Sequence, residues 1–289
     1  MTEEELDQAM DEAFTFQNPN TPTYILEQYA NDPDDFVRGS IAGNPSTPTA
    51  ILEKLANDPI YDVRMWVALN PSTPIAVLEK LSNDQNNYVR QWVARNTSTP
   101  IIILEKLLND PDEMVRDITA ENSSMPIAIL EKLSSSSDEW VRGGVARNPS
   151  TPIAIIEILS NDPDEWVRHA VAKNSSTPIS ILEKLSNEQG EFSEWVRLAI
   201  VSNIKTPTAM VEKLLPGLLD HARKLSTTPG KKDEFRYFIE NFDIWDIHCF
   251  SEDLDAELTE VLEDLEHIDS RHTPCSDGNE LEDDEGCPF

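Results

Sequence analysis

Seven arginines that recur at one position of a repeated pattern are the first residues whose type and spacing could do chemistry. Each follows a valine, and such a row of guanidinium groups could hold phosphates or a partner's carboxylates. Alternatively, each arginine pairs with an aspartate of its own or the adjacent repeat, such as Asp58, Asp110 or Asp162. Arginine suits partly buried, bidentate pairing, and these positions repeat strictly while others vary, which favours the structural role. The seven are Arg38, Arg64, Arg90, Arg116, Arg142, Arg168 and Arg197.

A second group of residues occupies variable positions beside the core face of the same segment. With Val167 as the core reference, Trp166 and Ala170 lie one helical turn apart on one flank. Aromatic residues and arginine are enriched at interaction hot spots, but a tryptophan can equally fill the gap between successive helices, so both interpretations stay open. The candidate partner-binding residues are Trp66, Tyr88, Trp92, Arg95, Trp140, Arg147, Trp166, His169, Lys173 and Trp195.

The remaining reactive side chains do not form a catalytic or metal-binding pattern. The late histidines and cysteines match no standard zinc spacing; they are His248, Cys249, His267, His272, Cys275 and Cys287. The chain has no glycine-rich phosphate loop, nucleophile elbow or HExxH motif. The sequence therefore predicts no enzyme, no cofactor and no metal site.

A repeat positions all of these residues. Copies begin at Asn18, Asn44, Asn70, Asn96, Asn122, Asn148 and Asn174, at a period of 26 residues. A truncated copy begins at Asn203, and the three extra residues before it predict a longer loop near Gln189–Ser193. A fixed period of this length is typical of solenoid proteins.

Each copy predicts two short helices, as residues 148–174 illustrate. Thr151-Pro152 predicts the first helix, with threonine as N-cap and proline at the first helical position. The run Asp162–Glu165 predicts the second as a capping box, and Asn174 should end it in the left-handed conformation. Apolar positions at helical spacing are Ile153, Ile155, Ile156, Leu159, Val167 and Val171. The Glu-Lys pairs, such as Glu105-Lys106, predict a solvated outer face.

The repeated residues resemble a known family. The pattern Asn-Pro-Ser-Thr-Pro-x-x-Ile-Leu-Glu-x-Leu-x-Asn-Asp-Pro-Asp-x-x-Val-Arg-x-x-Val-Ala is similar to the variant leucine-rich repeat, which belongs with the HEAT-like α-solenoids, over roughly residues 17–215. The resemblance implies a right-handed superhelix of paired short helices, the second partly 3₁₀, and functions that are mostly protein interaction. The family's cysteine cluster for an iron–sulfur centre does not carry over, because no cysteine precedes Cys249.

The predicted fold class is therefore all-α: a right-handed α-solenoid of about seven and a half 26-residue repeats with helical caps. An N-terminal capping helix should occupy residues 1–16 and the solenoid residues 17–216. An acidic helical cap should follow at 217–268, and a disordered acidic tail at 269–289.

The net charge of −31 limits the class of partner. It attracts basic proteins and opposes binding to nucleic acid or to an anionic membrane. The sequence has no 18-residue apolar run, an acidic start without a signal-peptide pattern, and three late cysteines. We therefore expect a cytoplasmic protein, by default a monomer.

These observations favour a non-enzymatic scaffold that binds a protein partner on the concave face of the solenoid, and the net charge favours a basic partner. One alternative is a nucleic-acid-binding or base-repair protein resembling the HEAT-like alkylpurine glycosylases, since aromatics with arginine suit base stacking and phosphate contacts. Another is an inhibitor or immunity-type protein whose acidic surface mimics nucleic acid before a basic toxin or nuclease.

Overall fold

The structure, a computed structural model, describes residues 18–187 and 193–227. The chain divides into two units, residues 1–207 and residues 208–289. The predicted N-terminal cap, the longer loop near residue 190, the acidic tail and most of the C-terminal cap lie outside the described residues. No helix in the described part is long and apolar enough to cross a membrane.

In the first unit the described residues form pairs of short α-helices, so the all-α solenoid is confirmed. The first helices are α2 (Thr23–Tyr29), α4 (Thr49–Leu55), α6 (Ile75–Leu81), α8 (Ile101–Leu107), α10 (Ile127–Leu133), α12 (Ile153–Leu159) and α14 (Ile179–Ser186). The second helices are α3 (Asp35–Gly43), α5 (Tyr61–Leu69), α7 (Asn87–Arg95), α9 (Glu113–Glu121), α11 (Glu139–Arg147), α13 (Glu165–Lys173) and α15 (Ser193–Val201). The second helices are α-helical, which corrects the partly 3₁₀ form implied by the resemblance.

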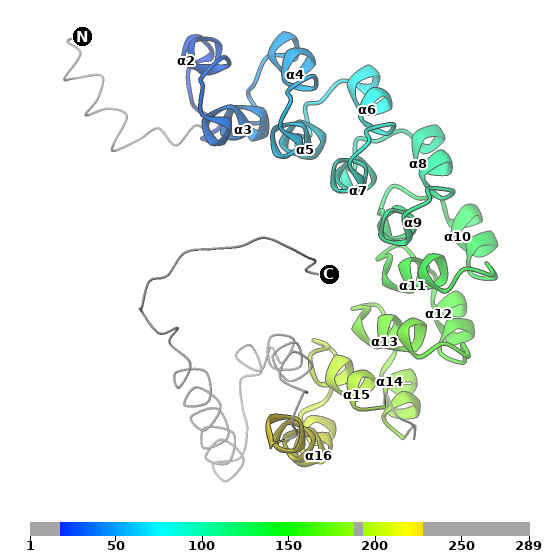
Figure 1. Ribbon diagram of the computed structural model, residues 1–289. Coiled ribbons are helices and arrows are strands. Elements are labelled where there is room, and N and C mark those ends of the chain that lie inside the picture. The colour runs from blue at the N-terminus through cyan, green and yellow to red at the C-terminus, as the bar shows by residue number, and fades with distance from the viewer. Residues whose placement is uncertain (1–17, 188–192, 228–289) are drawn as a thin grey trace, which may run out of the picture. The chain divides into compact units, whose positions relative to one another are not determined.

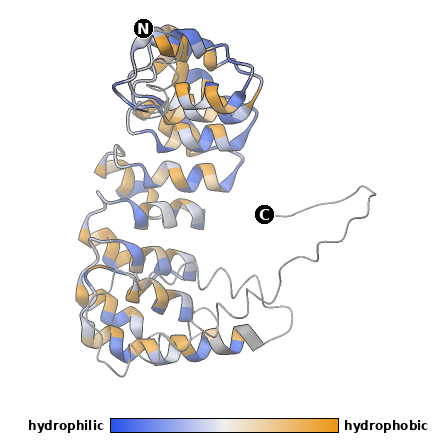
Figure 2. Cartoon of the chain, turned by 90° about the vertical axis from the view of Figure 1, so that its left-hand side faces the viewer, coloured by the Kyte–Doolittle hydropathy of each residue, from blue (hydrophilic) through white to orange (hydrophobic). Residues whose placement is uncertain are grey.

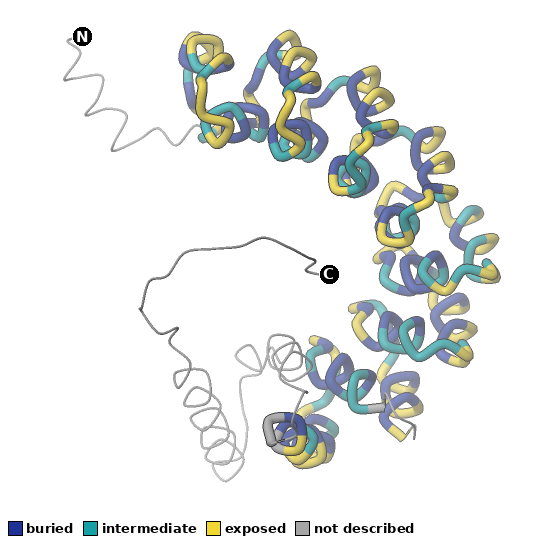
Figure 3. Tube along the Cα trace, viewed as in Figure 1, coloured by how far each residue is buried: buried dark blue, intermediate teal, exposed yellow. Residues whose placement is uncertain are grey.

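The second helices line the inner side of the curved repeat unit, and the first helices lie outside them (Figure 1). Successive second helices pack directly against one another, whereas each first helix contacts mainly the second helices beside it. Nearly every helix carries both apolar and polar segments (Figure 2). The sides of the first helices that face away from the second helices are largely exposed (Figure 3).

The core lies between the two helices of each repeat and between neighbouring repeats. Leu52 and Leu55 of α4 pack with Val63 and Val67 of α5 in one continuous apolar cluster, and all four are almost fully buried. Helices of seven to nine residues are marginal alone, so this burial, worth roughly 1.5–3 kcal/mol for each large side chain, stabilises them. Ile153 lies exposed at the start of α12 and does not contribute to the core.

The helix starts differ from those that the sequence predicted. The N-cap of α12 is Pro152, in an extended conformation, and Thr151 instead donates its hydroxyl to the carbonyl oxygen of Val145 at 2.6 Å. In the second helix Asp164 is the N-cap and accepts from the backbone of Trp166. Asp162 stabilises the turn that precedes α13, because its carboxylate accepts a hydrogen bond from the Asp164 backbone at 3.0 Å. Both predicted caps were wrong, because each predicted side chain has another partner.

The repeated asparagines end the second helices in an extended conformation, which corrects the predicted left-handed one. Asn174 has φ −67° and ψ 120°. Its side-chain amide donates to the carbonyl oxygens of Ala146 at 2.7 Å and Asn148 at 3.1 Å, both at the C-terminal end of α11. Asparagines 70, 96, 122, 148 and 203 make the same pair of contacts, so the buried amides form an asparagine ladder between repeats.

The second unit begins with one long helix, α16 (Thr208–Thr227), in its described part. The sequence predicted that the repeats extend to residue 216, but α16 runs through Pro216 without a break. The two units meet between Pro207 and Thr208.

Candidate functional site

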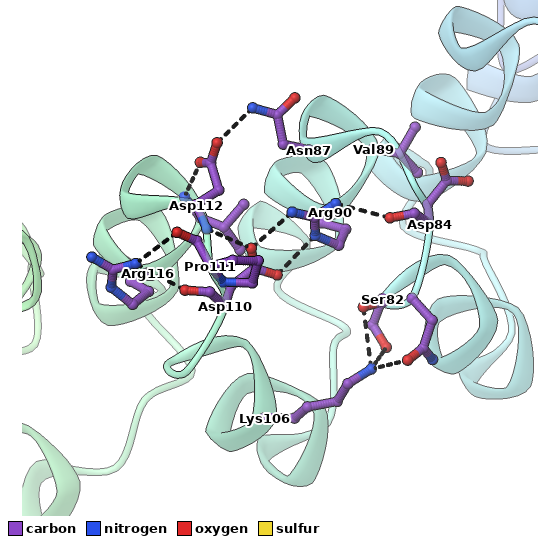
Figure 4. A network of polar contacts seen from close by, with 12 residues as sticks. Ser82, Asp84, Asn87, Val89, Arg90, Lys106, Asp110, Pro111, Asp112 and Arg116 are labelled. Atoms are coloured by element: carbon purple, nitrogen blue, oxygen red, sulfur yellow. Dashed lines mark hydrogen bonds and ion pairs between the residues drawn. The ribbon is translucent and has the colours of Figure 1, made fainter.

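The recurring arginines make bidentate ion pairs with aspartates 20 residues further along the chain. Arg90 of α7 donates from Nε and Nη2 to the two carboxylate oxygens of Asp110, each at 2.8 Å (Figure 4). Its Nη1 donates to the carbonyl oxygen of Asp84 at 2.9 Å, in its own repeat. The same geometry joins Arg38 to Asp58, Arg64 to Asp84 and Arg142 to Asp162. We call these four pairs the arginine ladder.

The charges of the arginine ladder balance within the fold. Burial alone would raise the pKa of Asp58, but the hydrogen bond and the charge of Arg38 bring that pKa below its usual value. The hydrogen bond to Asp58 in turn raises the pKa of Arg38 above its usual value. Each guanidinium also donates to carbonyl oxygens of its own loop, as Arg38 does to Asp32 at 2.9 Å. The ladder arginines are therefore engaged inside the frame.

The other three recurring arginines have different partners. Arg116 pairs with Asp138, 22 residues further on, through Nε at 2.5 Å. Arg168 donates to the carbonyl oxygen of Asp162 at 2.7 Å, and the residue 20 positions after it lies outside the described part. Arg197 contacts Glu194 of its own helix at 3.3 Å.

The Glu-Lys pairs of the first helices are exposed, as predicted, and several of their lysines also join neighbouring repeats. Lys106 of α8 donates from Nζ to the carbonyl oxygen of Ser82 at 3.2 Å and to the Asn83 side chain at 2.5 Å (Figure 4). Ser82 is the C-cap of α6, where the helix dipole favours a positive charge. Lys54, Lys80 and Lys184 make equivalent contacts.

Two of the candidate tryptophans pack between repeats. Trp66 of α5 lies against α3, where a β-carbon on Gly39 or Gly43 would stand 3.0 Å or 2.9 Å from its ring. Trp66 therefore fills the space that these two glycines leave open. Trp92 packs on the same apolar cluster, and the guanidinium carbon of Arg95 lies 5.4 Å from its ring centroid.

Large apolar side chains are exposed at the starts of four consecutive second helices. Phe36 of α3 is 79% exposed and Tyr88 of α7 is 49% exposed, with Tyr61 of α5 and Met114 of α9 at the same ends. Tyr61 and Tyr88 stack with their ring centroids 6.4 Å apart. We call these four residues the N-terminal apolar row. Of these four residues, sequence reasoning selected Tyr88 as a binding residue and missed Tyr61. Within its repeat, Tyr61 stands one position earlier than Tyr88 does in the next repeat.

A second aromatic group joins α11 and α13. The ring of Trp166 lies 5.6 Å from that of Trp140 and stacks on His169 at 5.3 Å, measured between centroids. The guanidinium carbon of Arg147 lies 5.2 Å from the Trp166 ring. The indole Nε1 of Trp166 would be 3.0 Å from a β-carbon on Gly143. Lys173 is exposed at the end of α13, and Trp195 of α15 is half-buried.

Sequence reasoning missed the acidic partners of this group. Asp117 of α9 is 2% exposed and pairs with Arg147, which also contacts Glu121 at 3.2 Å. Burial raises the pKa of Asp117 to about 6, outweighing the charge of Arg147. Burial also lowers the pKa of His169 to about 4, with the positive charges of Lys173 and Arg147 adding to the effect. The sequence did hold a signal for this buried pair: Asp117 is acidic at a repeat position that is glycine in α3 and in α11.

These residues belong to the frame between α9, α11 and α13. Four of their polar atoms are buried without a hydrogen-bond partner: Asp117 Oδ1, Arg147 Nη1, Trp166 Nε1 and His169 Nδ1. Since solvent does not reach these atoms, they do not line an open pocket. No group of three histidine, cysteine or acidic side chains is placed to hold a metal ion within residues 18–187 and 193–227.

No protein-family model and no curated protein sequence matches the chain. Among solved structures, the chain is similar to one described as a leucine-rich repeat variant with a novel repetitive structural motif. The two are 26% identical, the match covers 77% of this chain and 81% of that chain, and the TM-score is 0.42. With its 26-residue period and paired helices, the described part of the first unit is an α-solenoid.

Proposed function

We propose that the protein is a non-enzymatic interaction scaffold and that a protein partner docks on the N-terminal apolar row. The observation that carries the proposal is the exposure of four large apolar side chains at the same end of consecutive second helices. Aromatic side chains provide much of the binding energy in protein interfaces. The repeated arginines and asparagines bind within the frame, so the variable residues on the second helices remain to select a partner.

The charge around the row favours a basic partner. Asp35 precedes Phe36 in α3, Glu113 precedes Met114 in α9, and both acidic residues are exposed. The whole chain carries a net charge of −31. A basic segment with apolar side chains would bury the row while its lysines or arginines approach the acidic rim, and the charges would speed association at low salt.

The other candidate residues fall into two groups, those that are exposed and those that pack inside the frame. Arg95 and Lys173 are exposed at the C-terminal ends of α7 and α13 and remain candidates for contact with the same partner. Trp66, Trp92, Trp140 and Trp166 pack between or against repeats, so we assign them a supporting role. A cytoplasmic location fits a chain whose cysteines form no disulfide pattern.

The arginine ladder bears on the alternative of nucleic-acid binding. A polyanion would need basic groups at the surface, but the ladder guanidiniums bind aspartates and loop carbonyls. With a net charge of −31, this arrangement favours the scaffold over a nucleic-acid-binding protein. The inhibitor alternative shares the basic partner, and competition between DNA and the protein for such a toxin or nuclease would distinguish it.

Two matched variants test the proposal. In one, Phe36, Tyr61 and Tyr88 are changed to alanine; in the control, the exposed first-helix residues Ile75, Ile127 and Ile153 are changed to alanine. Proteins captured by the wild type should be retained by the control and lost by the row variant. The lost proteins should be basic, and raising the salt concentration should release them. If the two variants capture the same proteins, the row is not the interface.

A further inference from the structure

One position of the arginine ladder carries a serine in place of aspartate. Asp58, Asp84, Asp110 and Asp162 each stand 20 residues after the arginine that they bind. The residue that stands 20 positions after Arg116 is Ser136, in the loop between α10 and α11. The ladder is therefore interrupted at this loop.

Ser136 keeps the backbone contacts that the ladder aspartates make. Its Oγ accepts from the Asp138 backbone at 3.2 Å, as Asp110 Oδ1 accepts from the Asp112 backbone at 3.0 Å. Its carbonyl oxygen accepts from Arg142 Nη1 at 2.9 Å, as that of Asp110 accepts from Arg116 Nη1 at 2.8 Å. The loop has the geometry of its counterparts, and the difference at residue 136 is a missing negative charge.

Without that charge, Arg116 binds a substitute. Its Nε donates to Asp138, whose other carboxylate oxygen caps α11 by accepting from the Trp140 backbone. The side chains of this pair are 21% and 24% exposed, compared with 10–13% for the arginines and 6–9% for the aspartates of the ladder. Arg116 is thus held less deeply than the ladder arginines.

The surroundings of Ser136 suit a protein kinase that selects serines followed by acidic residues. Ser136 lies in the run Ser134–Ser137, and Ser135 and Ser137 are exposed. Asp138 and Glu139 follow this run of serines directly. The lysine that covers the equivalent loop in other repeats is replaced by Ile158, which leaves the side of the loop toward α12 without that cation.

We propose that Ser136 is a phosphorylation site whose phosphate replaces the missing ladder carboxylate and binds Arg116. A kinase would transfer the γ-phosphoryl group of a nucleoside triphosphate to Ser136 Oγ. The Oγ–P bond forms, the bond from the γ-phosphorus to the bridging oxygen breaks, the hydroxyl proton passes to the kinase's base, and the nucleoside diphosphate leaves. The phosphate adds a charge of about −1.5 to −2 and acceptor oxygens that arginine binds bidentately. Modification would join the α8–α9 repeat to the α10–α11 repeat as firmly as the ladder joins the others.

Phosphoserine placed at a single position of the full chain tests this contact. Phosphoserine at 136 should raise the unfolding temperature by roughly 2–4 °C, the shift that corresponds to about 1 kcal/mol in a chain of this size. The gain should disappear in the Arg116→Gln background, and phosphoserine at 137 should not produce it. Each comparison is made within one background, so destabilisation by Arg116→Gln itself cancels. A gain that persists without Arg116, or that appears equally at 137, overturns the contact.

The modification itself is tested by mass spectrometry. An acid-directed serine kinase with ATP should phosphorylate Ser136 in the folded chain, and Ser136→Ala should remove that modified peptide. Protein purified from its own cells with phosphatases inhibited should carry the same modification. If the peptide containing Ser136 is unmodified in both samples, or if phosphate is found on its neighbours instead, Ser136 is not the site.

Discussion

Arg147 of α11 binds the buried carboxylate of Asp117 in α9 and lies over the ring of Trp166 in α13 with its guanidinium carbon 5.2 Å from the ring centroid. One side chain therefore connects three successive second helices. The two glycines of α11 that precede Arg147 by three and four residues make this contact possible. A β-carbon on Gly143 would meet the Trp166 indole at 3.0 Å, and one on Gly144 would stand 2.3 Å from the Asp117 carbonyl oxygen.

Asp117 should make stability fall as the pH rises. Its folded-state pKa of about 6 lies above the usual 3.8, so its contribution is fully present below pH 3.8 and is lost as the pH rises through 6. A shift of this size corresponds to roughly 2–3 kcal/mol. Asp117→Asn keeps the shape and does not titrate. The difference in urea unfolding free energy between wild type and Asp117→Asn should change between pH 4.5 and 7, and a constant difference would contradict the buried carboxyl.

His169 should have the opposite effect and make stability fall as the pH falls. Its folded-state pKa of about 4 lies below the usual 6.5, so its contribution is present above pH 6.5 and is lost as the pH falls through 4. The imidazole should remain neutral at pH 5, where an exposed histidine is mostly charged. Nuclear magnetic resonance titration, with His169→Gln to assign the signal, measures this pKa. A midpoint near 6.5 would show that the ring is solvated and does not stack inside the frame.

Gly144→Ala should destabilise the protein more than Gly143→Ala. The Gly144 β-carbon would collide with the Asp117 backbone, which cannot move without separating α9 from α11, and such overpacking costs about 1–3 kcal/mol. The Gly143 β-carbon would meet the Trp166 side chain, which can shift. Alanine also favours a helix by about 1 kcal/mol over glycine, which partly offsets that contact. Thermal unfolding followed by circular dichroism compares the two, and equal losses would refute the close approach at Gly144.

Replacing Arg90 should lower the free energy of unfolding far more than replacing Arg95, although both residues belong to α7. Arg90→Gln leaves Asp110 buried without its partner, at a cost of about 3–5 kcal/mol. Arg95 is exposed and lies over Trp92, a contact worth about 0.5–1 kcal/mol at such sites. Urea unfolding of the two variants at the same pH measures the difference. Similar small losses for both would mean that the ladder does not stabilise the stack.

The sequence alone determined the repeat and its helical class. The interval between Asn148 and Asn174 gave the period, and the paired prolines Pro152 and Pro163 located the two helices of that copy. The strict recurrence of the arginines indicated a structural role, pairing with aspartates of their own or the adjacent repeat, because a side chain with one partner in every repeat tolerates no variation. These features are local or periodic, so they can be read without knowing how the repeats stack.

The tertiary structure decided which polar atoms meet across repeats. Thr151 and Asn174 donate to carbonyl oxygens of a neighbouring helix, and these acceptors come within reach only when the helices are packed. Local capping rules therefore misassigned both residues. Asp117 and Arg147 are 30 residues apart, and their contact depends on the close approach of α9 and α11 at Gly144. Burial, and with it the shifted pKa values of Asp117 and His169, follows from that approach, because desolvation depends on neighbours that the linear order of residues does not specify.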